Sequence, residues 1–175
     1  ELVALFNGFG GLASLLVGWS EFEKGGEGNW FLYSVICIAI LIGGITFTGS
    51  LVAYLKLSGK VGGNAVVFPF QKFINLLVML SAVLIGLILI IPNNVFENGA
   101  ALVWALIFLA LLVGVLGVIP IGGGDMPVVI ALLNSFSGLG AAAAGFVINN
   151  TVLVVAGCLV GASGLILSII MCKAM

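Results

Sequence analysis

The sequence predicts an all-α protein, a polytopic transmembrane bundle of about six helices with almost no soluble part. Hydrophobic residues make up 63% of the 175-residue chain, and charged residues only 6%. The mean hydropathy is +1.42. A soluble domain carries about a quarter charged residues, so the solvent for most of this chain is expected to be lipid. The apolar residues form six runs without strict alternation, which argues against a β-barrel.

The six runs are each close to the roughly 20 residues that cross a hydrocarbon core. They lie at about residues 2–19, 30–55, 73–91, 100–119, 127–148 and 151–175, within a single membrane domain over residues 1–175. The first run is short and contains Asn7 with several glycines. The second begins at Trp30 and ends beside Tyr54, as expected for aromatic residues at a membrane interface. The third follows the breaker-rich stretch between Lys56 and Phe70.

The last three runs are also separated by turn-forming residues. PNNVFENG precedes the fourth run, and PIGGGDM separates the fourth from the fifth. Pro127 is expected in the first turn of the fifth run, with Asp125 as its N-cap. Asn149 and Asn150 make a tight reversal before the sixth run, in which Gly157 and Gly161 form a GxxxG packing motif.

The lysines predict the orientation of the bundle. With six spans, Lys56, Lys60, Lys72 and Lys173 fall on one side and Lys24 on the other. The positive-inside rule then places both chain ends in the cytoplasm or its topological equivalent. The net charge of −1 gives no indication of a nucleic-acid partner. No residue pattern predicts a catalytic, cofactor-binding or metal site.

Polar side chains in several spans are predicted to form one layer. Asn7 lies ~9 Å into its run from the lysine-rich side, Asn134 roughly 10 Å and Ser50 roughly 8 Å, at 1.5 Å per residue. Asn75 enters from the same side. Hydrogen bonding between helices is the ordinary explanation, and Thr46, Thr48 and Ser135 are expected to bond back to their own helices. Convergence of Asn7, Ser50 and Asn134 favours a hydrated site for an ion or proton.

The connection before the fifth run carries a second candidate site. Asp125 follows Gly122, Gly123 and Gly124, which are expected to form a mobile hinge at the cytoplasmic mouth. There Asp125 could cap the next helix, receive a cation or contact a docked soluble domain. A channel or secondary transporter without redox chemistry, and a purely structural membrane subunit, both remain open at this point.

Five stretches of the chain resemble one known family. They are the opening ELVALFNGFGGLASLLVG, GITFTGSLVAYLKLSGK (Gly44–Lys60), PIGGGDMPVVIALLNSFSG (Pro120–Gly138), AAAAGF (Ala141–Phe146) and GCLVGASGLILSIIMCKAM (Gly157–Met175). They are similar to the β subunit of proton-translocating nicotinamide nucleotide transhydrogenase. The resemblance implies six helices of the membrane part of an enzyme that couples hydride transfer between NAD(H) and NADP(H) to proton movement.

The resemblance also implies partners and roles for individual residues. Asn134 matches a channel asparagine and Ser50 a channel-lining serine, while Asp125 matches the aspartate that faces the NADP(H)-binding domain. Asn7 stands where some members carry a channel histidine, so a partner's histidine is expected to carry the proton. The implied partners are α-subunit helices, the remaining β-subunit helices, soluble domains that bind NADP(H) and NAD(H), and a second protomer. The implied location is a bacterial or mitochondrial inner membrane, and this chain is expected to be a fragment that binds no cofactor.

Overall fold

The computed structural model describes residues 1–25, 29–90 and 99–174, which form six α-helices and one short 3₁₀ turn. The helices are α1 (Leu2–Glu23), α2 (Trp30–Leu57), α3 (Gln71–Ile90), α4 (Gly99–Val118), α5 (Met126–Val147) and α6 (Thr151–Ala174), and the turn η1 spans Gly123–Asp125. Each helix is long and apolar enough to cross a membrane, which confirms the predicted fold class. The predicted features at 91–98 and at Met175 lie outside the described residues.

The helices extend beyond several of the apolar runs that predict them. α1 continues to Glu23, where Glu21 and Lys24 form an ion pair of 2.7 Å one turn apart. α2 is preceded by the N-cap Asn29, whose side chain accepts a hydrogen bond from Phe31 N, and continues past Lys56 to Leu57. Apolar runs mark the part of a helix that lies in lipid. The backbone stays helical beyond them because charged residues at helix ends do not interrupt its hydrogen bonds.

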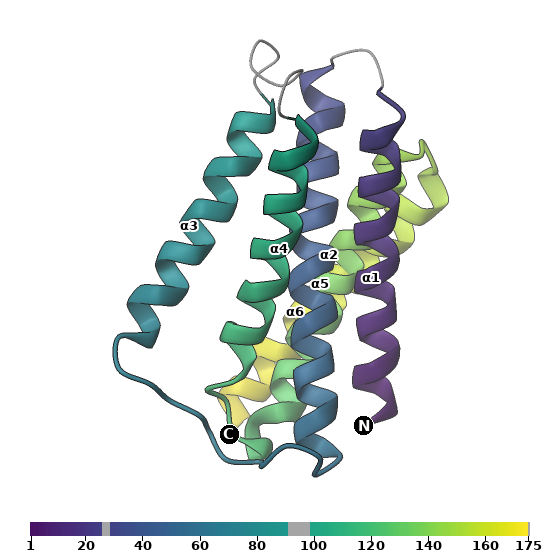
Figure 1. Ribbon diagram of the computed structural model, residues 1–175. Helices are drawn as coiled ribbons and strands as arrows, with labels where there is room; N and C mark the ends of the chain where they lie inside the picture. The colour runs from purple at the N-terminus through teal and green to yellow at the C-terminus, as the bar shows by residue number, and fades with distance from the viewer. Residues whose placement is uncertain (26–28, 91–98, 175) are drawn as a thin grey trace.

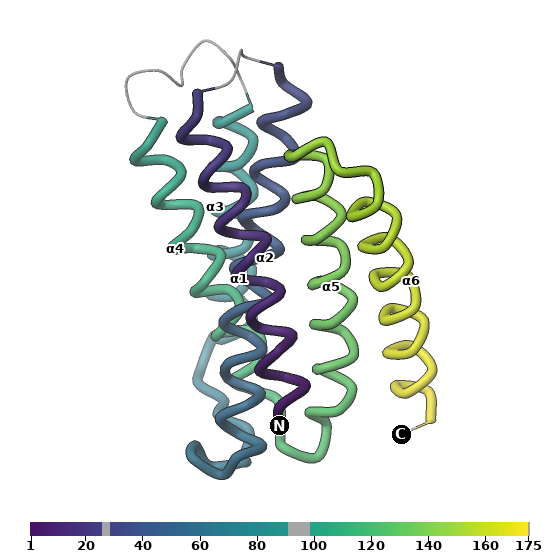
Figure 2. The backbone as a smooth tube through the Cα atoms, turned by 90° about the vertical axis from the view of Figure 1, so that its right-hand side faces the viewer, coloured from purple at the N-terminus to yellow at the C-terminus, as the bar shows by residue number. Residues whose placement is uncertain are grey.

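The six helices cross the bundle in alternating directions (Figures 1 and 2). Both ends of the chain therefore lie at the same end of the bundle, together with the α2–α3 and α4–α5 connections. Lys56, Lys60 and Lys72 lie in or beside those connections, and we call this the lysine-rich end. α2 is central and packs against α1, α3, α4 and α5, whereas α6 packs mainly on α5.

Glycines let the central helices approach closely. A methyl group added to Gly43 of α2 would lie 2.6 Å from Gly11 O of α1, so the two backbones are nearly in contact. Gly157 of α6 is as tightly placed, because an added methyl group would lie 2.7 Å from Gly138 O of α5. The GxxxG motif of the sixth run thus packs on α5, as small residues do between membrane helices.

Two apolar clusters fill the interior at different levels. The outer cluster includes Leu15, Ile36, Ile40, Leu106 and Ala143, with further residues of α2, α3, α4 and α5. The lysine-end cluster consists of Ala4, Ala53, Val118, Met126, Val129 and Leu133. On α1, α2 and α5, the polar residues predicted from the sequence lie between the positions that form these two clusters.

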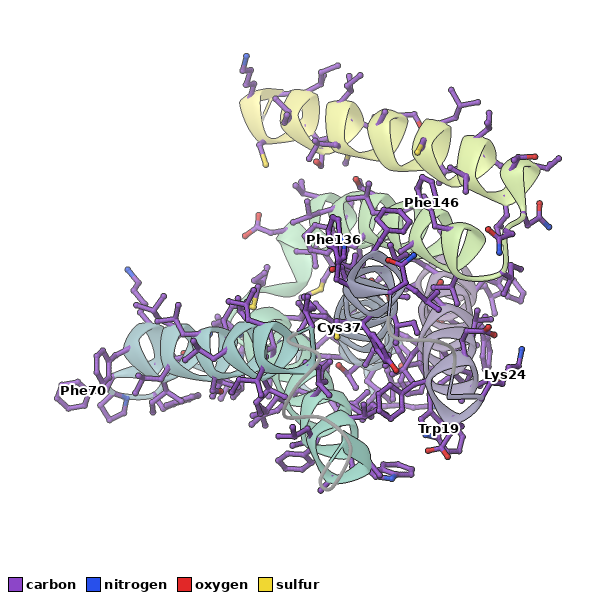
Figure 3. The ribbon with its side chains drawn as sticks, turned by 90° about the horizontal axis from the view of Figure 1, so that it is seen from above. Trp19, Lys24, Cys37, Phe70, Phe136 and Phe146 are labelled. Carbon is purple, nitrogen blue, oxygen red and sulfur yellow. The ribbon has the colours of Figure 1, made fainter. Side chains whose placement is uncertain are left out.

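The outermost helices expose most of their apolar side chains. Only 17% of the apolar, membrane-spanning stretch of α3 is buried inside this chain, and only 22% of that of α6. Viewed from above, α3 and α6 project to the periphery, and Phe70 points away from the other helices (Figure 3). Such apolar surfaces are expected where a helix faces lipid or another membrane subunit.

Candidate functional site: a buried polar layer

Asn7 and Ser50 form a hydrogen-bonded pair between α1 and α2. Asn7 Nδ2 donates to Ser50 Oγ over 3.1 Å. Asn7 is only 7% exposed and Ser50 is fully buried. The close approach of the two helices at this level explains the contact, since Gly8 packs directly on the Ser50 side chain. Two of the three residues predicted to converge therefore do so.

The Asn7 amide is not fully satisfied. Its Oδ1 atom is buried and has no hydrogen-bond partner among the described residues. Turning the amide about its axis would exchange the two atoms and still leave one without a partner. Buried polar atoms are rarely left unpaired, and a water molecule or a group from another chain is the usual partner. The pair is therefore equipped to bind one more donor or acceptor.

Two apolar clusters enclose this polar layer. Along α1, Ala4 of the lysine-end cluster precedes Asn7, and Leu15 of the outer cluster follows it. Along α2, Ile40 and Ala53 flank Ser50 in the same way. The Asn7–Ser50 pair therefore lies between two apolar clusters along both helices. On α5, the lysine-end cluster includes Met126, Val129 and Leu133.

Asn134 lies at the same level but on a different surface. The Ser137 side chain of α5 packs on Gly10 of α1, so a methyl group added to Gly10 would lie 2.8 Å from Ser137 Oγ. Asn7 and Asn134 each lie three residues before this contact on helices that run in the same direction. However, Asn134 is exposed and makes no hydrogen bond to any described residue. The chain alone leaves it open to the outside of the bundle.

Asp125 stands at the N-cap position of α5, but its side chain caps nothing. No backbone N–H donates to its carboxylate, so the predicted capping bond is wrong. Gly123, Gly124 and Asp125 form the 3₁₀ turn η1, and Pro127 supplies the expected proline in the first turn of α5. The 3₁₀ turn leads directly into the helix, which leaves the carboxylate exposed at the lysine-rich end and free for a partner.

Lys56 fixes the segment in front of that carboxylate. Its side chain is 4% exposed, and Nζ donates to Ile119 O at 2.5 Å, Ile121 O at 2.8 Å and Asn64 O at 3.4 Å. The positive charge thus meets the carbonyl groups that follow the C-terminus of α4, where a cation is favoured by the helix dipole. Gly123 N also donates to Gly63 O over 2.8 Å. The glycine-rich connection is therefore bonded to the α2–α3 connection.

Sequence reasoning missed two cross-helix hydrogen bonds and the contacts of the Lys56 side chain. Thr48 Oγ1 donates to Leu111 O of α4 at 2.7 Å as well as to its own helix. Ser135 Oγ donates to Gly161 O of α6 at 2.6 Å, although a bond within its own helix was expected. Thr46 does bond to its own helix, as expected. Lys56 was used only to orient the bundle, because its side-chain partners are backbone atoms that carry no sequence signal.

Comparison with known proteins places these residues in a family. The sequence model of the family "NAD(P) transhydrogenase beta subunit" matches residues 1–175. The chain belongs to the NAD(P) transhydrogenase beta subunit family. The chain is also similar to two curated relatives, both NAD(P) transhydrogenase subunit beta from Rhodospirillum rubrum, one of them from strain ATCC 11170. Each is 40% identical over 183 residues, an alignment that covers 100% of this chain and 38% of the relative.

The match confirms the resemblance inferred from the motifs and identifies the six-helix bundle as a membrane protein of this family. The chain spans about two fifths of the length of the curated relatives it matches. The polar layer, the lysine-end cluster and the Lys56 contacts all belong to this portion.

Proposed function

We propose that this chain is part of the membrane proton pathway of an NAD(P) transhydrogenase, in which proton movement is coupled to hydride transfer between NAD(H) and NADP(H). Membership of the beta subunit family supports the redox assignment over a channel or secondary transporter without redox chemistry. The observation that carries the site is the buried Asn7–Ser50 pair, with an unpaired amide atom, between two apolar clusters.

Polar but uncharged side chains can hold water along a proton pathway without carrying the proton themselves. Asn7, Ser50 and Asn134 can each bind water, yet none of them titrates near neutral pH. The chain contains no histidine, and the acidic residues within the described part lie at the helix ends. The proposed proton carrier is therefore a group from another subunit, such as a histidine, that reaches the level of Asn7 through the open Asn134 surface.

The α4–α5 connection is the proposed control point. Met126, Val129 and Leu133 of the lysine-end cluster follow Asp125 within two turns of α5. A small displacement of the start of α5 would therefore open or close an apolar constriction, formed by the lysine-end cluster, on the lysine-rich side of the Asn7–Ser50 pair. We propose that an NADP(H)-binding domain contacts exposed Asp125 and that its nucleotide state displaces the segment from Gly122 to Asp125.

The same proposal includes the wider assembly. NADP(H) and NAD(H) would bind to adjoining soluble domains rather than to these helices. The exposed faces of α3, α5 and α6 would contact α-subunit helices, other β-subunit helices, a second protomer and lipid. The lysine-rich end would face the cytoplasm or matrix of a bacterial or mitochondrial inner membrane, in agreement with the positive-inside rule.

The test uses the complete enzyme in proteoliposomes with the substitution Asn134→Leu. Proton uptake driven by transhydrogenation should fall at least tenfold, because an apolar side chain cannot bind water at the open face of the polar layer. Hydride exchange by the soluble domains alone should be unchanged. Ser163→Leu on α6 is the control, since it removes an exposed hydroxyl that bonds Val160 O of its own helix, away from the α1–α2–α5 layer.

Two results would count against the proposal. Normal proton uptake in Asn134→Leu would remove this asparagine from the pathway. An equal loss in Ser163→Leu would show that general destabilisation, rather than loss of a polar relay, explains the effect.

A further inference from the structure

A second polar site lies at the lysine-rich end, apart from the proposed proton pathway. A cavity of about 430 Å³ opens between the start of α3, the end of the α2–α3 connection and Pro120 after α4. Its lining includes Phe68, Phe70, Gln71, Lys72, Asn75 and Pro120. None of these residues belongs to the Asn7–Ser50 layer or to the Lys56 contacts.

Two buried atoms in this lining have no partner among the described residues. Gln71 is 6% exposed, and its Nε2 atom, a donor, is unpaired. Asn75 donates to Leu116 O through Nδ2, but its buried Oδ1 atom, an acceptor, is unpaired. A buried amide without a partner costs about 1–3 kcal/mol. A ligand that offers both an acceptor and a donor would satisfy the two atoms together.

The charge and surroundings of the cavity specify the ligand further. Among the described residues, Lys72 is the charged residue of the lining and no acidic residue is part of it, so the cavity favours an anion. Val67 and Phe70 of the lining and Phe73 beside it have apolar side chains that are 72%, 82% and 59% exposed. Figure 3 shows Phe70 at the edge of the molecule, beside the start of α3, pointing away from the bundle. An anionic group bound here would therefore be attached to an apolar tail beside it.

We propose that this cavity binds the headgroup of an anionic phospholipid, with a phosphate at Lys72 and Gln71 Nε2 and a headgroup hydroxyl that donates to Asn75 Oδ1. Basic pockets at the ends of membrane helices bind such headgroups. A bound lipid would connect the start of α3 to Pro120 and the segment after α4. Among the described helices, α3 packs mainly on α4 and α2, so it has few other anchors.

The experiment measures lipid retained by the complete enzyme, which is purified with its partner subunits from phosphatidylglycerol-containing membranes and analysed by native mass spectrometry. The wild type should retain phosphatidylglycerol in preference to phosphatidylcholine, whose headgroup has no hydroxyl. Lys72→Gln should lower retention about fivefold, since a lysine near a membrane surface contributes about that factor toward an anionic lipid. Gln71→Leu should lower it as well.

Lys60→Gln is the matched control, because Lys60 also lies at the lysine-rich end but interacts with the Tyr54 ring. It should retain lipid as the wild type does. Equal retention in Lys72→Gln and wild type, or an equal loss in Lys60→Gln, would overturn the proposal. So would displacement of the lipid by soluble glycerol phosphate at similar concentration, which would indicate a phosphate site without a lipid. A cavity found filled by a helix of a partner subunit would overturn it too.

Discussion

Lys56→Met provides a direct test of how the connection before Asp125 is held. Methionine is unbranched and similar in length to the lysine stem, so the apolar contacts are kept while the ammonium is removed. The hydrogen bonds to Ile119 O and Ile121 O, at 2.5 and 2.8 Å, are then lost, whereas the contact to Asn64 O at 3.4 Å is too long to contribute much.

The lost hydrogen bonds to Ile119 O and Ile121 O differ in their free-energy cost. Ile119 O keeps a hydrogen bond from Val66 N at 3.3 Å, but Ile121 O loses the donor that it has in this structure. Leaving a buried carbonyl without a donor costs about 1–3 kcal/mol, and losing one of two donors costs about 1 kcal/mol. The substitution also removes the cost of burying a charge without an acidic partner. We therefore expect a net destabilisation of about 2 kcal/mol.

Stability is measured by titration of the reconstituted protein with SDS, followed by far-UV circular dichroism. A cysteine reporter at exposed Gly124 gives a second measurement, because a loosened connection should react faster with a soluble maleimide. Lys60→Met is the control and should change stability by less than about 0.5 kcal/mol, as expected for an exposed side chain. Equal stability and equal labelling in the two variants would refute the assigned role of Lys56.

Two further substitutions test helix packing by the same SDS titration. Gly43→Ala should destabilise the α1–α2 pair by about 1–3 kcal/mol, because its methyl group would lie 2.6 Å from Gly11 O. Its control, Gly117→Ala, has open space around the added methyl group and should be neutral or slightly stabilising. Ser135→Ala should cost about 1 kcal/mol through loss of the α5–α6 hydrogen bond, whereas Ser163→Ala removes only a bond within α6 and should cost less. A larger effect in either control would contradict the packing described.

The fold class was predictable because the length of the apolar runs decides it. Six apolar runs of membrane-spanning length leave helices as the only structures that satisfy their backbone in lipid, once alternating strands are excluded. Helix neighbours were less predictable. The GxxxG of α6 indicates a close partner, but nothing in the sequence identifies that partner as α5 or shows that α2 lies at the centre.

The depth of the candidate site residues in the bundle was predictable, but the direction in which their side chains point was not. Residue counts from the span ends place Asn7 and Ser50 at one level, and the structure joins them by a hydrogen bond. The same counts place Asn134 at that level too, yet helical rotation turns it to the outside. Rotation about the helix axis could not be read from α5, because small and apolar residues occupy most of its faces.

The exposed position of Asn134 has a consequence for the whole bundle. An asparagine eight residues into α5 lies roughly 12 Å from its start at 1.5 Å per residue, deep within the span. A polar amide at that depth is costly in hydrocarbon and is normally found facing protein or water. Asn7, on the neighbouring helix at the same level, also has an amide atom without a partner. Another subunit that covers α5 at this level would explain the exposed Asn134 amide. That subunit would then be in position to bring a titratable group to the polar layer.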